Sequence, residues 1–208
     1  MSISTYDELQ AAITDWVKRS DQTAAIPNII QLAEAEFNRE LRATEMETRA
    51  TATADGEYLV LPSDCLDVRS LHVEGSPDRV LKYYSPQELS YITSENYSGS
   101  IPFCYTVVDG QFKFYPAPTA DATLDLEIIY IQKIPALSDS NTTNWLLTRH
   151  PDLYLSCCLS KAEKYIHNDQ RVAMWTTEYK EIIAWINREA NKRRVASTPL
   201  NPIVRNIV

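Results

Sequence analysis

Apolar residues recur every three or four positions near both ends of the chain, which is the spacing of an amphipathic helix. Thr5 and Glu8 form a capping-box pattern, so a first helix of about three turns is expected to begin there. Pro27 can open a second helix, because a first helical residue needs no N–H. The apolar face of this second helix would consist of Ile29, Ile30, Ala33, Phe37 and Leu41, and most of the remaining face would be charged: Glu34, Glu36, Arg39 and Glu40.

The last third of the chain has the same helical spacing. An Asn-Trp-Leu-Leu loop leads to Pro151, where a helix can begin, and Asp152 suits the positive end of the helix dipole. Two apolar stripes follow, separated by a polar break at residues 167–169. The first stripe is Tyr154, Cys158, Ala162, Tyr165 and Ile166, and the second is Val172, Trp175, Tyr179, Ile182, Ile183 and Ile186.

Between these helical ends the pattern changes to the alternation of β-strands. Residues 44–51 and 58–62 flank Asp55-Gly56 and are predicted to form a hairpin, and residues 68–73 and 79–84 are two further strand candidates. Ser85 and Glu88 form a capping-box pattern, so a short helix is expected at residues 85–92. The strongest hairpin signal joins residues 105–108 to 111–115 through Asp109-Gly110, and residues 122–131 add a strand.

The simplest packing brings the two helical ends together. It predicts an α+β chain with a discontinuous four-helix bundle, an inserted antiparallel β domain and an extended C-terminal arm. The expected domains are 1–44 with 142–195 for the bundle, 45–141 for the β-rich insertion, and 196–208 for the arm.

Charge is distributed unevenly over the 208 residues. The net charge is −8, yet residues 45–141 carry −9 and residues 188–208 carry +4. An acidic body argues against tight binding to duplex DNA but suits a surface past which DNA slides. No stretch approaches the roughly 20 apolar residues of a membrane span, and the N-terminus lacks the basic start of a secretory signal. We therefore expect no membrane association and a chain that stays in the cytosol where it is made.

Residues that could carry chemistry are sparse. The three histidines, His72, His150 and His167, lack the spacing of metal ligands, and the four glycines lie at turns instead of forming a phosphate cradle. We therefore predict no metal, no cofactor and no catalytic residue. Cys157 and Cys158 could serve as nucleophiles beside a histidine base, but thiols within an apolar helical stripe favour core packing. All four cysteines are expected to be reduced.

The C-terminal segment is the sharpest functional signal. Four basic residues cluster at the end of the last helix: Arg188, Lys192, Arg193 and Arg194. Small polar and branched apolar residues then alternate, including Pro199, Leu200, Ile203, Val204, Arg205, Ile207 and Val208. Such a segment cannot build its own core, and burying each Leu, Ile or Val on a partner would contribute roughly 1.5–3 kcal/mol before ordering costs. The alternative is a frayed terminus whose cations complement the helix dipole.

Four passages resemble the head-to-tail adaptor, or connector, proteins of tailed bacteriophages: the N-terminal helical hairpin, Asp55-Gly56 to Pro62, Asp109-Gly110 with Phe112 to Pro118, and Pro135 to Leu155. The resemblance includes no catalytic motif. It implies a structural virion protein that forms a homo-oligomeric ring, typically dodecameric like the portal, with a central DNA channel. The ring would be assembled in the host cytoplasm and would lie in the neck between capsid and tail.

The resemblance also implies where partners would bind. Arg188 to Val208 would contact the portal, the helices would contact neighbouring subunits, and the β region would meet the next tail component, a nozzle, tube or stopper. DNA would pass without sequence-specific binding. Aromatic residues crowd the β region, and those not needed for its core would form the tail-side contact: Tyr83, Tyr84, Tyr97 and Phe103.

Two alternatives from other classes stay open. The chain could be a small hydrolase or transferase that uses β-region carboxylates, which are Asp64, Asp67, Asp121, Asp125 and Glu127. It could instead be a regulatory DNA-binding protein that uses the helix carrying Lys192-Arg193-Arg194.

Overall fold

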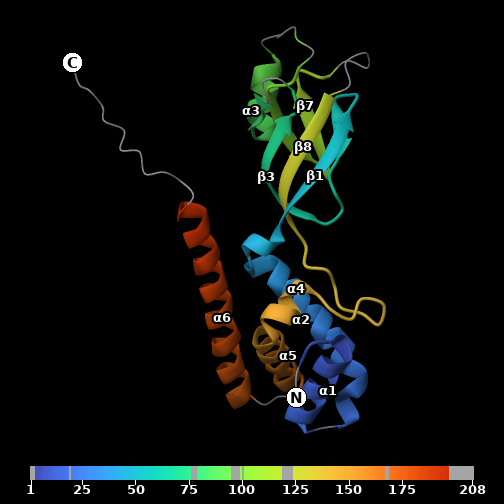
Figure 1. Cartoon of the computed structure of the whole chain (residues 1–208), viewed down its shortest axis with the longest axis vertical. Coiled ribbons are helices and arrows are strands. Elements are labelled where there is room, and N and C mark those ends of the chain that lie inside the picture. Colours follow the sequence, from blue (N-terminus) through green and yellow to red (C-terminus); the bar gives the residue numbers. More distant parts are fainter. Residues whose placement is uncertain are drawn as a thin grey trace, which may run out of the picture. The chain divides into compact units, whose positions relative to one another are not determined.

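The computed structural model describes residues 3–18, 20–75, 79–94, 99, 101–118, 124–166 and 169–196. The chain divides into two compact units (Figure 1): a helical unit, Met1–Glu45 with Ile134–Val208, and a β unit, Met46–Lys133. The expected α+β class is confirmed. The expected arm, residues 196–208, lies outside the described residues beyond Ala196.

The helical unit begins with the two helices that the sequence predicts. In α1 (Tyr6–Val17), the Glu8 N–H donates to Thr5 Oγ1 at 3.3 Å and the Glu8 carboxylate accepts from the Thr5 N–H at 3.2 Å, which forms the capping box. A 3-10 turn, η1 (Ser20–Ala25), precedes α2 (Ile26–Glu40), which has Pro27 in its first turn. The apolar residues of both helices are buried: Leu9, Ile13, Ile29, Ile30 and Phe37.

Three further helices complete this unit. They are α4 (Trp145–Arg149), α5 (Pro151–Tyr165) and α6 (Asp169–Ala196). The helices α1, α2, α4 and α6 all pack against α5, which is the central element. Figure 1 shows α6 along one side of α5, at the edge of the unit. It buries a single stripe: Tyr179, Ile183, Ile186 and Ala190.

The expected bundle of four helices is incomplete as a description of this unit. Its described residues form five α-helices, because residues 145–149, which we expected to be a loop, form α4. Asn144 caps this short helix by accepting the Leu147 N–H at 2.8 Å. Residues 134–141, which we placed in the β insertion, cluster with the helices, and the Ile134 N–H donates to Asn38 Oδ1 at 2.9 Å.

A buried carboxylate joins three segments of the helical unit. Glu34 of α2 is 5% exposed, and its Oε1 accepts hydrogen bonds from the Leu137 N–H at 2.8 Å and the Tyr154 hydroxyl at 3.1 Å. The Asn144 amide donates to the same hydroxyl at 2.8 Å and to the Pro135 carbonyl at 2.9 Å. Burial raises the pKa of Glu34 above its ordinary value of 4.5, although both hydrogen bonds to the carboxylate oppose this shift.

A second carboxylate of α2 joins α5 and α6. Glu36 accepts a hydrogen bond from the Tyr179 hydroxyl at 2.7 Å and forms a salt bridge with the Lys161 ammonium. Burial alone would raise the pKa of Glu36, but these two partners outweigh it and hold the pKa below its ordinary value. The Glu36 anion therefore stabilises the packing of three helices.

The β unit contains two sheets of four strands each. The first has the order β1 (Glu47–Ala54), β8 (Leu124–Gln132), β3 (Cys65–Val73) and β4 (Arg79–Val80), and all its pairs are antiparallel. The second has the order β2 (Tyr58–Val60), β7 (Gln111–Tyr115), β6 (Cys104–Val108) and β5 (Lys82–Tyr83). Side chains of both sheets form one core: Leu71, Tyr105, Phe112, Phe114, Leu126 and Ile128.

The predicted turn at Asp109-Gly110 is confirmed, because both residues have positive φ, 52° and 68°, as a type I′ hairpin requires. The predicted hairpin across Asp55-Gly56 is wrong. Strand β1 pairs with β8 in one sheet and β2 pairs with β7 in the other, so residues 55–57 cross between sheets.

The β unit also departs from a purely antiparallel arrangement, since β5 runs parallel to β6. The connection between them contains α3 (Pro86–Thr93), which returns the chain in the same direction. Ser85 and Glu88 form the capping box of this helix, as predicted. Among its residues Leu89 is buried, and α3 packs against β6.

Replacing Glu34 with Gln tests the buried carboxylate. The variant Glu34→Gln keeps an oxygen that can accept both hydrogen bonds but carries no charge. The pKa of Glu34 in the folded chain lies above 4.5, so the unfolded chain releases this proton at a lower pH than the folded chain does. Wild type therefore loses stability relative to the variant as pH rises from about 4.5 through the pKa of Glu34 in the folded chain. We expect the two free energies of unfolding, measured by urea denaturation, to be similar in acid and to diverge in favour of Gln toward neutral pH.

The matched control is Glu34→Ala, which leaves the Tyr154 hydroxyl and the Leu137 N–H without their acceptor. It should destabilise the chain by about 1–3 kcal/mol across the same pH range. If the difference in free energy of unfolding between wild type and Glu34→Gln does not change with pH, the raised pKa of Glu34 is contradicted.

Candidate interaction surfaces

The four basic residues at the end of α6 divide into two pairs, and one pair is bound within the helical unit. Arg193 lies 3.4 Å from the Glu45 carboxylate and donates to Thr44 Oγ1 at 3.3 Å. Arg194 donates to the Arg42 carbonyl at 3.2 Å. These contacts fix the end of α6 against the segment that follows α2.

The other pair, Arg188 and Lys192, is exposed. Arg188 forms no salt bridge with any described residue, and Lys192 pairs with Glu189 of its own helix at 2.6 Å. An exposed pair of this kind contributes little stability, so both cations are available to a partner at small cost. Five residues of α6 line a shallow groove of about 580 Å³, which we call the basic groove: Ala184, Asn187, Arg188, Asn191 and Lys192.

The expected portal-binding residues beyond α6 lie outside the described residues. They are Pro199, Leu200, Ile203, Val204, Arg205, Ile207 and Val208. The structure therefore brings Arg188 and Lys192 together on one exposed surface, and it assigns Arg193 and Arg194 contacts within the chain.

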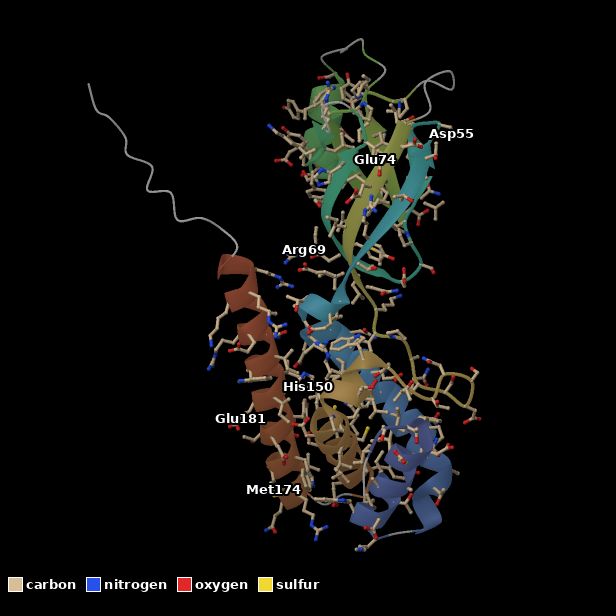
Figure 2. The ribbon with its side chains drawn as sticks, in the orientation of Figure 1. Asp55, Arg69, Glu74, His150, Met174 and Glu181 are labelled. Atoms are coloured by element: carbon tan, nitrogen blue, oxygen red, sulfur yellow. The ribbon has the colours of Figure 1, made fainter. Side chains whose placement is uncertain are left out.

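A second groove follows α6 where this helix meets the start of α5. His150, at the junction of α4 and α5, contacts the Trp185 ring edge-on, with ring centres 6.1 Å apart. In Figure 2, His150 lies between α6 and the start of α5, whereas Glu181 points to the outer side of α6. Six residues line a cavity of about 430 Å³, which we call the Trp185 groove: His150, Asp152, Glu178, Glu181, Ile182 and Trp185.

A neighbouring cavity of about 230 Å³ shares His150 and Trp185 with this groove. Its charged wall is Glu45, which forms salt bridges with Arg149 and Arg193. Burial alone would raise the pKa of Glu45, but hydrogen bonds and the two guanidinium groups outweigh burial and lower it. Glu45 is thus an anion that fixes α4 and α6 to the end of α2.

In the β unit, the predicted tail-side residues are only partly exposed. Tyr83 on β5 is 59% exposed, and its ring meets Tyr105 edge-on at 5.6 Å. Tyr84 is half-buried, and its N–H donates to the Tyr105 carbonyl at 2.9 Å. Phe103 is half-buried with its ring 5.9 Å from that of Tyr115.

Tyr97, the fourth predicted member of this surface, lies outside the described residues. Tyr83 also lines a cavity of about 390 Å³ between β3 and the strands β5 and β6. Its other lining residues are mostly apolar: Leu61, Cys65, Leu66, Asp67, Val68, Arg69, Tyr105 and Val107.

Trp185, which sequence reasoning did not single out, is 53% exposed. Tyr165, which we placed on an apolar stripe, is 62% exposed, and Tyr91, one of the β-region aromatic residues on α3, is 83% exposed. The signal for Trp185 was present, because it lies off the stripe formed by Tyr179, Ile183 and Ile186.

The carboxylates of the enzyme alternative serve structural contacts. Asp64 accepts hydrogen bonds from Tyr130 at 3.2 Å and Gln132 at 2.6 Å. Asp125 accepts the Thr53 hydroxyl at 3.0 Å, and Glu127 forms a salt bridge with Arg49 at 2.7 Å, whereas Asp121 lies outside the described residues. Across the described ranges, no group of three His, Cys, Asp or Glu side chains is arranged to hold a metal ion.

Cys157 and Cys158 are fully buried in α5. Burial raises the pKa of Cys157 to about 12 and raises that of Cys158 well above its ordinary value. Both thiols are therefore protonated at neutral pH, which opposes a nucleophilic role. Of the proposed histidine bases, His150 faces Trp185, and His167 lies outside the described residues.

Among the helices that the structure describes, none is both long and apolar enough to cross a membrane. Comparison with known families gives a match to the family described as "SU10 adaptor protein" over residues 4–203. No curated protein matches the chain.

Thiol alkylation tests the core assignment of the cysteines. In the folded chain near neutral pH, iodoacetamide should modify half-buried Cys65 first and leave Cys104, Cys157 and Cys158 unmodified, because these three are buried and protonated. Peptide mass spectrometry measures each site. In urea all four should react, and rapid modification of Cys157 in the folded chain would support the nucleophile alternative instead.

Proposed function

The chain belongs to the SU10 adaptor protein family, a family of phage head–tail adaptors, and from this we propose that it forms a ring between the portal and the next tail component. The observation that carries the proposal is the match over residues 4–203, which includes both structural units. The role is structural, and the ring would lie in the virion neck after assembly in the host cytoplasm.

The proposed ring is dodecameric, like the portal, with a central channel for DNA. The charge of the chain supports passage without sequence-specific binding, because residues 46–133 carry a net charge of −7. An acidic surface repels phosphate groups and so limits adhesion of DNA that moves past it.

We assign the portal contact to Arg188, Lys192 and the arm from Pro199 to Val208. Arg188 and Lys192 are exposed at the end of α6, and the last buried side chain among the described residues is Ala190. The core that the described residues form thus ends before the arm begins. The arm would become ordered only when the portal offers a groove for its apolar residues, which is coupled folding and binding.

We assign the tail-side contact to the β unit around Tyr83, with Tyr84, Tyr97 and Phe103. Exposed tyrosine beside an apolar cavity supports this assignment, since tyrosine combines a large apolar ring with a hydroxyl and is enriched at interfaces. The next component would be a nozzle, tube or stopper.

Both alternatives have less support. A hydrolase or transferase needs carboxylates that share a site, whereas Asp64, Asp125 and Glu127 have separate structural partners. A DNA-binding helix needs several free cations, whereas two of the three in Lys192-Arg193-Arg194 have partners in the chain: Arg193 and Arg194 contact Thr44, Glu45 and the Arg42 carbonyl.

Deleting Pro199 to Val208 tests the portal arm. The urea unfolding midpoint should stay near that of wild type, because the described core ends at Ala190. Binding to immobilised portal should be lost. The control variant keeps the arm length but replaces Leu200, Ile203, Val204, Ile207 and Val208 with Ser. It should fail to bind as well, and a truncated chain that still binds the portal would contradict the proposal.

Replacing Tyr83 with Ala tests the tail-side contact. The variant should bind the next tail component at least tenfold more weakly, as expected for a truncated interface tyrosine, which costs more than about 1.4 kcal/mol. Tyr91→Ala is the matched control, because Tyr91 is more exposed and does not line the cavity. Equal loss of binding in both variants, measured by surface plasmon resonance, would refute the assignment to Tyr83.

A further inference from the structure

Most of the surface of α6 is uncovered. Tyr179, Ile183, Ile186 and Ala190 form the one stripe that packs on the rest of the helical unit. The Trp185 groove and the basic groove lie outside this stripe, and the basic groove is further along the helix. Residues seven apart lie on nearly one line along a helix, so the line of Glu178 and Trp185 continues to Lys192, and the line of Glu181 continues to Arg188. Ala184 and Asn191 form a line about 100° further round the helix axis.

The Trp185 groove is acidic and has an aromatic anchor. Three carboxylates, Asp152, Glu178 and Glu181, are exposed in it, and none forms a salt bridge with a described residue. Trp185 lines the same groove and is half exposed. Unpaired charge around a large apolar ring is the arrangement of an interface anchor with a polar rim, and its sign calls for a cationic partner.

The basic groove has the opposite properties. Its lining residues are the small or short side chains Ala184, Asn187 and Asn191 with the two cations Arg188 and Lys192. A flat surface with small side chains can receive a protruding ring, and its cations can meet carboxylates. The basic groove therefore complements the Trp185 groove in charge.

We infer that the Trp185 groove of one copy binds the basic groove of α6 in the next copy. This inference rests on the proposed function only in taking a second copy as the partner. It gives Arg188 and Lys192 to the neighbouring copy, so that the portal contact is left to the arm from Pro199 to Val208. Two different, complementary surfaces on one subunit make a head-to-tail contact, and such contacts generate rings when the rotation closes. The basic groove lies about seven residues, or roughly 10 Å, further along α6 than the acidic one, so adjacent α6 helices would be staggered.

Charge exchange between the two grooves tests this interface. Glu181→Lys places a cation opposite the basic groove, and Arg188→Glu places an anion opposite the acidic one. Each variant alone should associate with itself roughly tenfold more weakly than wild type, or worse, in sedimentation velocity at low salt. An equimolar mixture of the two variants should regain association, because every contact in alternating copies then pairs opposite charges.

Two controls carry the same charge changes away from both grooves. Asp139→Lys lies in the loop before α4, and Lys164→Glu lies near the end of α5; both residues are exposed. These variants should associate like wild type. Failure of the mixture to recover association, or equal weakening in the controls, overturns the inference.

Disulfide trapping gives a second measurement that detects even weak encounters. Glu181→Cys and Arg188→Cys copies, distinguished by mass and mixed under mild oxidation, should form the mixed disulfide faster than either copy pairs with itself. Equal rates would overturn the inference. Neither assay contains portal or tail, so the interface and the head–tail role can fail independently.

Discussion

The helical unit depends on one buried carboxylate, Glu34. Removing a carboxylate from water costs free energy, so this position is tolerable only because two donors, the Leu137 N–H and the Tyr154 hydroxyl, reach it. The hydrogen bond from Tyr154 to Glu34 belongs to a network that also holds Asn144 in place. Tyr154 also accepts from Asn144, which caps α4, so the acid on α2 fixes the loop from residue 134 and the start of α4 together.

Further polar contacts of α2 fix α6 along its length. Glu36 meets Tyr179, and beyond the end of α2 the Arg42 N–H donates to Asn187 Oδ1 at 2.7 Å. Asn187 also donates to the Glu40 carbonyl at 2.9 Å. Because these bonds and the apolar stripe lie on the inner side of α6, the helix is held in place while its outer sides stay uncovered. The surfaces proposed for assembly are therefore presented on a rigid element.

Local rules explain what the sequence predicted correctly. The capping boxes at Thr5 and Ser85, the helix start at Pro151 and the turn at Asp109-Gly110 each depend on residues within four positions of one another. The hairpin across Asp55-Gly56 was wrong because the signal for a turn is local, whereas the partner of β1 is β8, some 80 residues away. No residue pattern near residue 55 indicates that β1 pairs with β8 instead of β2.

The same distinction applies to Glu34 and Glu36, which we placed from the sequence on the charged part of α2. Helical spacing places Glu34 on the apolar line itself, three residues before Phe37 and seven before Leu41. It does not show that residues 134–144 and α5 supply the partners of Glu34, or that α5 and α6 supply those of Glu36. Burial of Glu34 follows from a segment about 100 residues further along the chain. The positions of charged residues in a helical pattern can therefore be read from the sequence. Only the tertiary structure shows whether water or protein groups form hydrogen bonds with them.

The basic cluster at the end of α6 shows how this affects functional inference. In the sequence Arg188, Lys192, Arg193 and Arg194 form one group, yet Arg193 and Arg194 find acceptors at Glu45 and the Arg42 carbonyl. Counting basic residues in the sequence thus overestimates the number of cations that are available to a partner. Trp185 was not singled out in the sequence, yet its ring is half exposed. Leaving such a ring in water has a free-energy cost. That cost is offset when a partner covers it, which is the physical reason to look for assembly contacts on α6.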